Sequence, residues 1–122
     1  MYNRLMVKLI DIISPIYQEL LEKCGRRKIS VNLDFQNLHT SIEDDETVRK
    51  FFMTEIKRAL KMCEAGDKIT ISQSPSADGK NRLSVKNSSK ETLDAETVQK
   101  LRDAGYEIRA RFGYDTIITL VI

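Results

Sequence analysis

The sequence predicts an α+β protein in which helices cover one face of a mixed sheet, and the order of two hydrophobic periodicities predicts it. Three segments repeat apolar residues at helical spacing, and five shorter segments alternate or run continuously as strands do. Their order is αβαββαββ, which suits a two-layer α/β sandwich with three helices on one face of a mostly antiparallel sheet of about five strands. At 122 residues the chain is expected to form a single domain.

The first predicted helix has Pro15 in its middle. Its apolar residues recur every three or four positions: Leu5, Leu9, Ile12, Ile13, Ile16 and Leu20. Because Pro15 lacks a backbone N–H and crowds the carbonyl four residues before it, we expect a kink there or a restart at Ser14. Gly25 is expected to end the helix. Residues 1–25 would then be a kinked N-terminal helix ahead of a core in residues 44–122.

The next two elements are a strand and a helix joined by a polar loop. Residues 29–35 alternate apolar and polar side chains, which predicts a strand with one buried face. Ser41 stands at the capping-box spacing, and Asp44 and Asp45 open the helix. Together with Glu43, these carboxylates could hold a hard cation, but a helix start explains them without one. The helix presents an apolar stripe over residues 48–63.

The second half of the chain predicts a hairpin, a helix and two more strands. Turn-forming residues 74–81 separate the two strands of the hairpin. Asp94 is suited to capping the last helix. Residues 106–112 alternate, with Phe112 on the apolar side, and the apolar run 117–122 is typical of a strand buried on both faces.

The composition argues against several classes of protein. With 20 basic and 18 acidic residues, the net charge of +2 gives no general case for nucleic acid or membrane as partner. No apolar stretch is long enough to span a membrane and no signal-peptide pattern is present, so we expect a cytoplasmic protein. Cys24 and Cys63 are too few for a zinc or disulfide framework and are expected to be small buried side chains.

Several segments in order resemble the ATP-binding domain of histidine kinases, which has the Bergerat fold. Residues 58–61 (Arg-Ala-Leu-Lys) look like the family's Asn-Ala-Ile-Lys helix end, and residues 68–71 look like its Lys-Ile-Thr-Ile strand. Residues 83–89 look like its Val-x-Asp-x-Gly strand end, and residues 115–120 resemble its closing Gly-Thr-Thr-Phe strand. The kinked first helix and the first strand also fit, so the resemblance covers nearly the whole chain.

The departures from the family pattern all fall on the nucleotide chemistry. Thr54 and Arg58 stand where the family has two asparagines one helical turn apart, one of which holds magnesium, and a guanidinium cannot ligate a cation. Asn87 stands at the adenine-reading aspartate, and its amide oxygen could still accept from adenine. Ser89 and Glu91 replace glycines that let the backbone approach the ligand, and Glu91 would also repel a triphosphate.

The family's glycine-rich lid is also missing. Residues 91–93 run directly into the last helix, and no Gly-x-Gly loop offers backbone donors to phosphate. His39 is a lone loop histidine, which we expect to be solvated and not a phosphotransfer residue. The resemblance therefore implies a degenerate, pseudo-kinase domain with no catalytic residue, no metal site and no cofactor, although weak ATP binding stays possible.

Three functions stay open. The first is a non-catalytic module that acts through a protein partner or self-association in bacterial two-component or related signal transduction. The second is the weak ATP-binding domain of a minimal histidine kinase, and the third is a structural or nucleic-acid-binding protein. Four cations could line the former nucleotide cleft and contact an anion or acidic partner: Arg58, Lys86, Arg109 and Arg111. The alternatives are a solvated sheet face and, for Arg58, a surface pair with Glu55.

Overall fold

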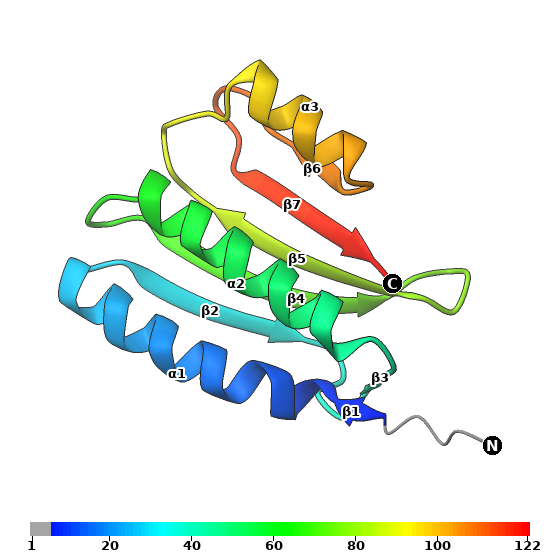
Figure 1. The fold of residues 1–122 in the computed structure, drawn as a ribbon. Helices are drawn as coiled ribbons and strands as arrows, with labels where there is room; N and C mark the ends of the chain where they lie inside the picture. The colour runs from blue at the N-terminus through cyan, green and yellow to red at the C-terminus, as the bar shows by residue number, and fades with distance from the viewer. Residues whose placement is uncertain (1–5) are drawn as a thin grey trace.

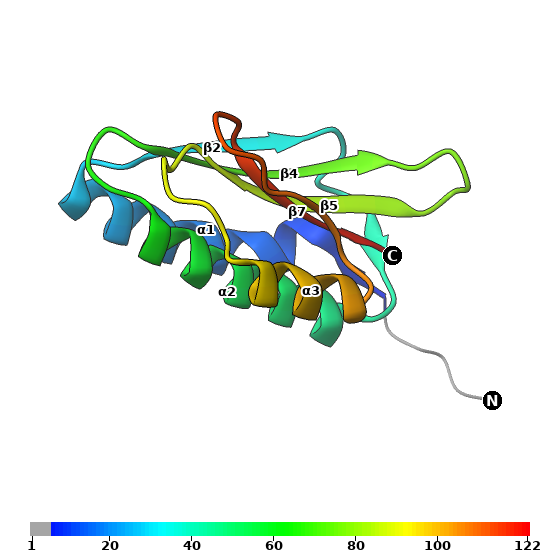
Figure 2. The same cartoon turned by 90° about the horizontal axis from the view of Figure 1, so that it is seen from above.

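The computed structural model describes residues 6–122, in which three helices cover one face of a five-stranded sheet (Figures 1 and 2). The helices are α1 Leu9–Arg27, α2 Asp45–Met62 and α3 Ala95–Asp103. The strands, in spatial order, are β2 Ser30–Phe35, β4 Lys68–Pro75, β5 Asn81–Asn87, β7 Thr116–Val121 and β6 Glu107–Arg109. The β2–β4 pair is parallel and the other neighbours are antiparallel, which confirms the expected fold class and two-layer architecture.

Two further strands, β1 Val7–Lys8 and β3 Ser41–Ile42, pair antiparallel as a separate small sheet. The sequence does not predict these two strands, because a segment of two residues is too short to show an alternation of apolar and polar side chains. Ser41 therefore does not cap α2, and the loop expected between β2 and α2 contains a strand. Asp44 is the cap, since its side chain accepts a hydrogen bond from the backbone N–H of Thr47 at 3.2 Å.

α1 continues through Pro15 without interruption, so the expected restart at Ser14 is wrong (Figure 1). The Ser14 hydroxyl donates to the carbonyl of Ile10 at 2.7 Å, which is a bond within the helix and not a cap. The expected end at Gly25 is also wrong. Lys28 ends the helix in the left-handed conformation, with φ 57°, where glycine is the usual residue.

Hydrogen bonds hold both ends of α1, one end to the loop at residues 38–40 ahead of α2 and the other to the end of α2. The first two N–H groups of α1 donate to the carbonyls of Thr40 and Leu38, each at 2.8 Å, which satisfies them without a side-chain cap. At the other end, the Arg27 guanidinium donates to the carbonyls of Leu60 and Cys63 at 2.6 and 2.7 Å. These bonds hold the two helices side by side on the sheet (Figures 1 and 2).

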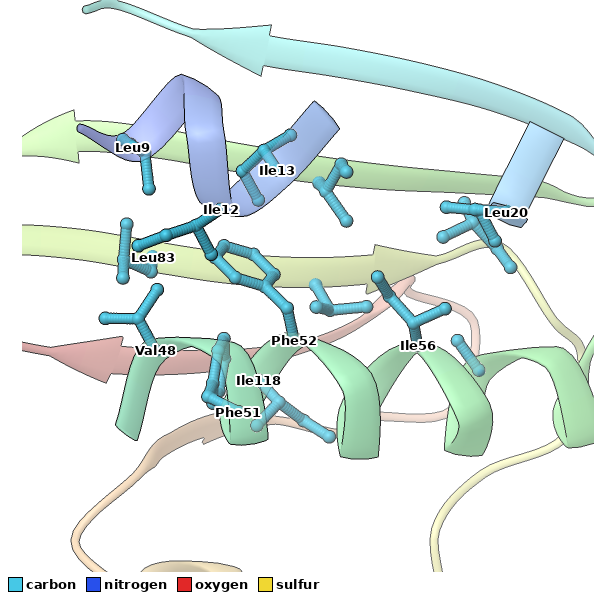
Figure 3. Packing of buried hydrophobic residues seen from close by; sticks show 14 of the residues in the cluster. Leu9, Ile12, Ile13, Leu20, Val48, Phe51, Phe52, Ile56, Leu83 and Ile118 are labelled. Atoms are coloured by element: carbon cyan, nitrogen blue, oxygen red, sulfur yellow. The ribbon is translucent and has the colours of Figure 1, made fainter. Parts of the chain in front are cut away.

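The core lies between the helices and the sheet. Phe51 and Phe52 of α2 are fully buried and meet edge to face, with ring centroids 5.3 Å apart. They pack with residues of α1 such as Ile12 and with strand residues such as Leu83 and Ile118 (Figure 3). Within residues 6–122 no helix has the length and apolarity needed to cross a membrane.

The last two strands depart from expectation. No described helix covers the second face of the sheet (Figure 2). The expected burial of β7 on both faces is therefore only partial: on the uncovered face Ile117 is half-buried, although Thr119 is buried. β6 ends at Arg109, earlier than predicted. Phe112, expected on the buried side, is 89% exposed because the chain leaves the sheet to make a turn at Gly113, where φ is 83°.

Candidate functional site

α2 carries Thr54 and Arg58, which stand at the positions of the two asparagines of histidine kinases, and the two side chains have different surroundings. Thr54 is exposed to solvent. The Arg58 Nε donates to Glu55 Oε1 at 2.9 Å, and Glu55 is only 2% exposed. The predicted pairing of Glu55 with Arg58 is confirmed, but its description as a surface pair is wrong, since the carboxylate lies inside the protein. Glu55 and burial together raise the pKa of Tyr106, burial having the larger effect.

Asn87, at the end of β5, is also engaged by the protein. It is 3% exposed and its register neighbours are Ile69 and Thr116. Its Nδ2 donates a hydrogen bond to the sulfur of Met62 at 3.8 Å, and its Oδ1 accepts one from the backbone N–H of Ser89 at 3.1 Å. The amide oxygen that could read adenine therefore already accepts a local hydrogen bond.

Ser89 joins the segment after β5 to the end of α2. Its hydroxyl donates to the carbonyl of Met62 at 2.6 Å and accepts from the backbone N–H of Glu91 at 3.0 Å. Glu91 itself is exposed. Only residues 88–94 separate β5 from α3, whose cap Asp94 accepts from the backbone N–H of Thr97 at 2.7 Å, as predicted. This short, internally bonded connection stands where the family has its lid.

The structure does not bring Arg58 together with the other three cations. Lys86 and Arg109 lie in one row across β5, β7 and β6 on the uncovered face of the sheet, whereas α2 lies on the opposite face. The ammonium of Lys86 lies 3.5 Å from the Asp115 carboxylate, and the backbone carbonyl of Asp115 accepts from Arg109 at the same distance. The guanidinium carbons of Arg109 and Arg111 lie 5.8 and 5.6 Å from the ring centroid of Tyr114.

Neither of two cavities formed by side chains of residues 6–122 is lined by Thr54, Arg58 or Asn87. One, of about 270 Å³, lies between residues 88–92 and the turn at 112–115, and Ser89 is part of its wall. The other, of about 430 Å³, lies between α1 and α2. The four candidate cations, Arg58, Lys86, Arg109 and Arg111, therefore line neither of these cavities.

Glu55 and Met62 contribute to this region without having been predicted as buried partners. Both carried a signal, since each falls at helical spacing from the buried Phe51, Phe52 or Ala59. A charged side chain that is buried in that stripe needs a partner for its charge, and the partly exposed Arg58 is that partner.

The remaining candidates are placed as follows. Within residues 6–122 no three His, Cys, Asp or Glu side chains gather as a metal site. His39 is exposed, and its backbone N–H donates to Asn37 Oδ1 at 2.9 Å. Cys24 and Cys63 are free and buried, as expected. Burial, with smaller effects from Asp67 and Cys24, raises the pKa of Cys63 to about 11.

The fold matches solved structures, whereas sequence comparison finds no match. No family model matches the chain, and no curated protein does. Solved structures of histidine kinases match it strongly. The resemblance inferred from the residues is therefore confirmed at the level of the fold: the chain has the fold of a histidine kinase catalytic domain.

Three solved structures illustrate the likeness. The nucleotide-free catalytic domain of histidine kinase ThkA is 17% identical with a TM-score of 0.78, over 99% of this chain and 95% of that chain. Histidine kinase AdeS of Acinetobacter baumannii is 12% identical with a TM-score of 0.73, over 100% of this chain and 68% of that chain. The mycobacterial sensor histidine kinase MprB is 11% identical with a TM-score of 0.68, over 97% of each chain.

Proposed function

We propose that this protein is a non-catalytic, histidine-kinase-like module that acts through protein–protein contacts in bacterial signal transduction. The observation that carries the proposal is the ion pair between Arg58 and the buried Glu55, because it stands at the helix turn from which the family holds magnesium. A metal ion at this turn would face a fixed positive charge. Freeing Glu55 to neutralise it would break a pair with one buried partner, at a cost of about 2–3 kcal/mol.

The adenine end supports the same proposal. The polar atoms of Asn87 and Ser89 already form hydrogen bonds with Met62 and with the backbone of residues 89–91. A nucleotide would have to displace these bonds and would find no lid to close over its phosphates. The loss of about 2–3 kcal/mol at the metal alone corresponds to roughly a hundredfold in Kd.

A thermal-shift measurement with Mg-ATP, ATP alone and Mg-ADP tests the proposal, with the ThkA catalytic domain as the positive control. A ligand at 100 times its Kd stabilises by about 2.7 kcal/mol, or roughly 10 °C in Tm for a chain of this size. We expect no change at about 5 mM nucleotide, which would place any Kd in the millimolar range or above. A magnesium-dependent rise of several degrees would reject the proposal.

A second candidate, weak nucleotide binding without catalysis, is favoured by Asn87 alone. Its Oδ1 has a second lone pair beyond the bond from Ser89, so it could accept from an adenine amino group if residues 88–91 moved. This candidate predicts a small stabilisation by ATP that does not need magnesium and that disappears in Asn87→Leu. A third candidate, nucleic-acid binding, predicts affinity that falls steeply with salt, and a mobility-shift titration at two salt concentrations tests it.

A further inference from the structure

The outer side of the α1–α2 pair is an apolar groove that the fold itself does not use. The cavity of about 430 Å³ between the two helices has a floor of apolar side chains: Ile16, Leu20, Met53, Ile56 and Leu60. Most of these also touch the core, but Met53 does not belong to it and is 61% exposed. A large apolar side chain held in water beside a concave apolar surface is typical of a contact site.

The rim of this groove is mostly positive. Lys23, Arg49 and one carboxylate, Glu19, line it; Lys23 is paired with Glu19 at 2.9 Å, and Arg49 is paired with Asp45 at 3.1 Å. Lys57 also lines it, and no carboxylate of the described residues forms a salt bridge with it.

Two further lysines extend this positive side along α2. Lys50 and Lys61 are exposed at two turns and one turn from Lys57 respectively, on the same side of the helix. Neither forms a salt bridge among residues 6–122. The surface next to the apolar floor therefore offers three unpaired ammonium groups.

No helix of a second copy suits the groove, and the most exposed aromatic side chain of such a copy, Phe112, follows the positively charged Arg111. The outward faces of α1 and α3 are polar, with Leu21 the one exposed large apolar side chain on them. Groove-to-groove contact would place Lys57 and its neighbours against the same lysines of the other copy, which costs free energy. The occupant has to bring both apolar and negatively charged side chains.

We infer that the α1–α2 groove binds an amphipathic helix of a partner protein, whose apolar stripe enters the groove and whose acidic flank meets Lys57. Two parallel-packed helices present a trough into which a third helix can lay residues at i, i+3, i+4 and i+7. This inference rests on the proposed function and names the chemistry of its partner.

A designed peptide provides the test. The probe is a fluorescein-labelled amphipathic 18-residue helix with leucines on one face and glutamates beside them, and its control carries lysines in place of the glutamates. Fluorescence anisotropy against the full chain should give a micromolar Kd for the acidic peptide and much weaker binding for the basic one. Equal binding of the two peptides, or no binding of the acidic peptide at roughly 1 mM protein, would overturn the inference.

Three variants place the binding in the groove. Lys57→Glu should weaken the acidic peptide roughly tenfold and improve the basic one, and Met53→Glu should weaken both. Lys80→Glu makes the same charge change in the exposed β4–β5 turn and should leave both unchanged. An equal effect of Lys57→Glu and Lys80→Glu would show a general charge effect and no site, which overturns the inference.

Oligomeric state and nucleotide binding give independent outcomes. Light scattering should show a monomer at tens of micromolar, and a dimer abolished by Met53→Glu would overturn the inference in favour of a second copy as occupant. If the acidic peptide does not bind and Mg-ATP gives no stabilisation, the groove is rejected as a binding site and the proposed function stands. If Mg-ATP stabilises the chain while the peptide binds, the proposed function is rejected and the groove stands.

Discussion

Replacing Arg58 by alanine tests whether the carboxylate inside α2 depends on it. The Glu55 side chain is 1% exposed and the Arg58 side chain 32% exposed, so the pair lies between the surface and the interior. Exposed pairs contribute at most about 1 kcal/mol, whereas removing one partner of a fully buried pair costs about 3–5 kcal/mol. Because Arg58 is partly screened by water, we expect Arg58→Ala to cost about 2–3 kcal/mol.

Urea denaturation followed by circular dichroism at pH 7 measures this loss. The matched control is Arg49→Ala on the same helix, where the pair with Asp45 has side chains 39% and 32% exposed and should contribute about 0.5 kcal/mol or less. The double variant Glu55→Leu with Arg58→Leu should recover most of the stability, since no buried charge is then left without a partner. A cost for Arg58→Ala no larger than for Arg49→Ala would refute the reasoning.

Four further predictions concern stability and reactivity. Ser89→Ala removes the hydroxyl that bonds to Met62 and should cost about 1–2 kcal/mol in urea denaturation. Lys28→Gly should raise stability by roughly 0.5–1 kcal/mol, because φ 57° is strained for lysine and free for glycine, and a loss would show that the lysine side chain matters there. The raised pKa of Cys63 means that the unfolded thiol ionises first, so stability should fall as pH rises from 9.0 to about 11. At pH 8 the native thiol should react with Ellman's reagent far more slowly than in urea, and equal rates would contradict its burial.

The main elements could be predicted because their periodicity is long and regular. The stripe of α2 over residues 48–63 and the alternation of β2 appear in the structure as expected. The restart predicted at Ser14 was wrong because the packing of α1 against α2 and the sheet outweighs what Pro15 costs the helix, a lost donor and a crowded carbonyl. The β7 run misled because its burial depends on what covers the far face of the sheet, which no local pattern records.

The candidate site could be predicted only in part, for a related reason. Thr54, Arg58 and Asn87 were found by their place in a family pattern, which gives identity but not contacts. Asn87 and Ser89 each donate one hydrogen bond to Met62, which is 25 and 27 residues away in the chain. Such pairings depend on how the end of α2 sits against β5, and that geometry follows from the whole core.

The fastening of α1 at both ends has a consequence for how a partner would be recognised. Hydrogen bonds to the loop at residues 38–40 hold one end, and Arg27 holds the other against the end of α2. The spacing of the two helices is therefore set before any ligand arrives, and this protein has little conformational entropy to lose on binding. Affinity would then depend mainly on how well the incoming helix is itself preformed, so that stapling the acidic peptide into a helix should tighten its binding more than adding apolar area to it.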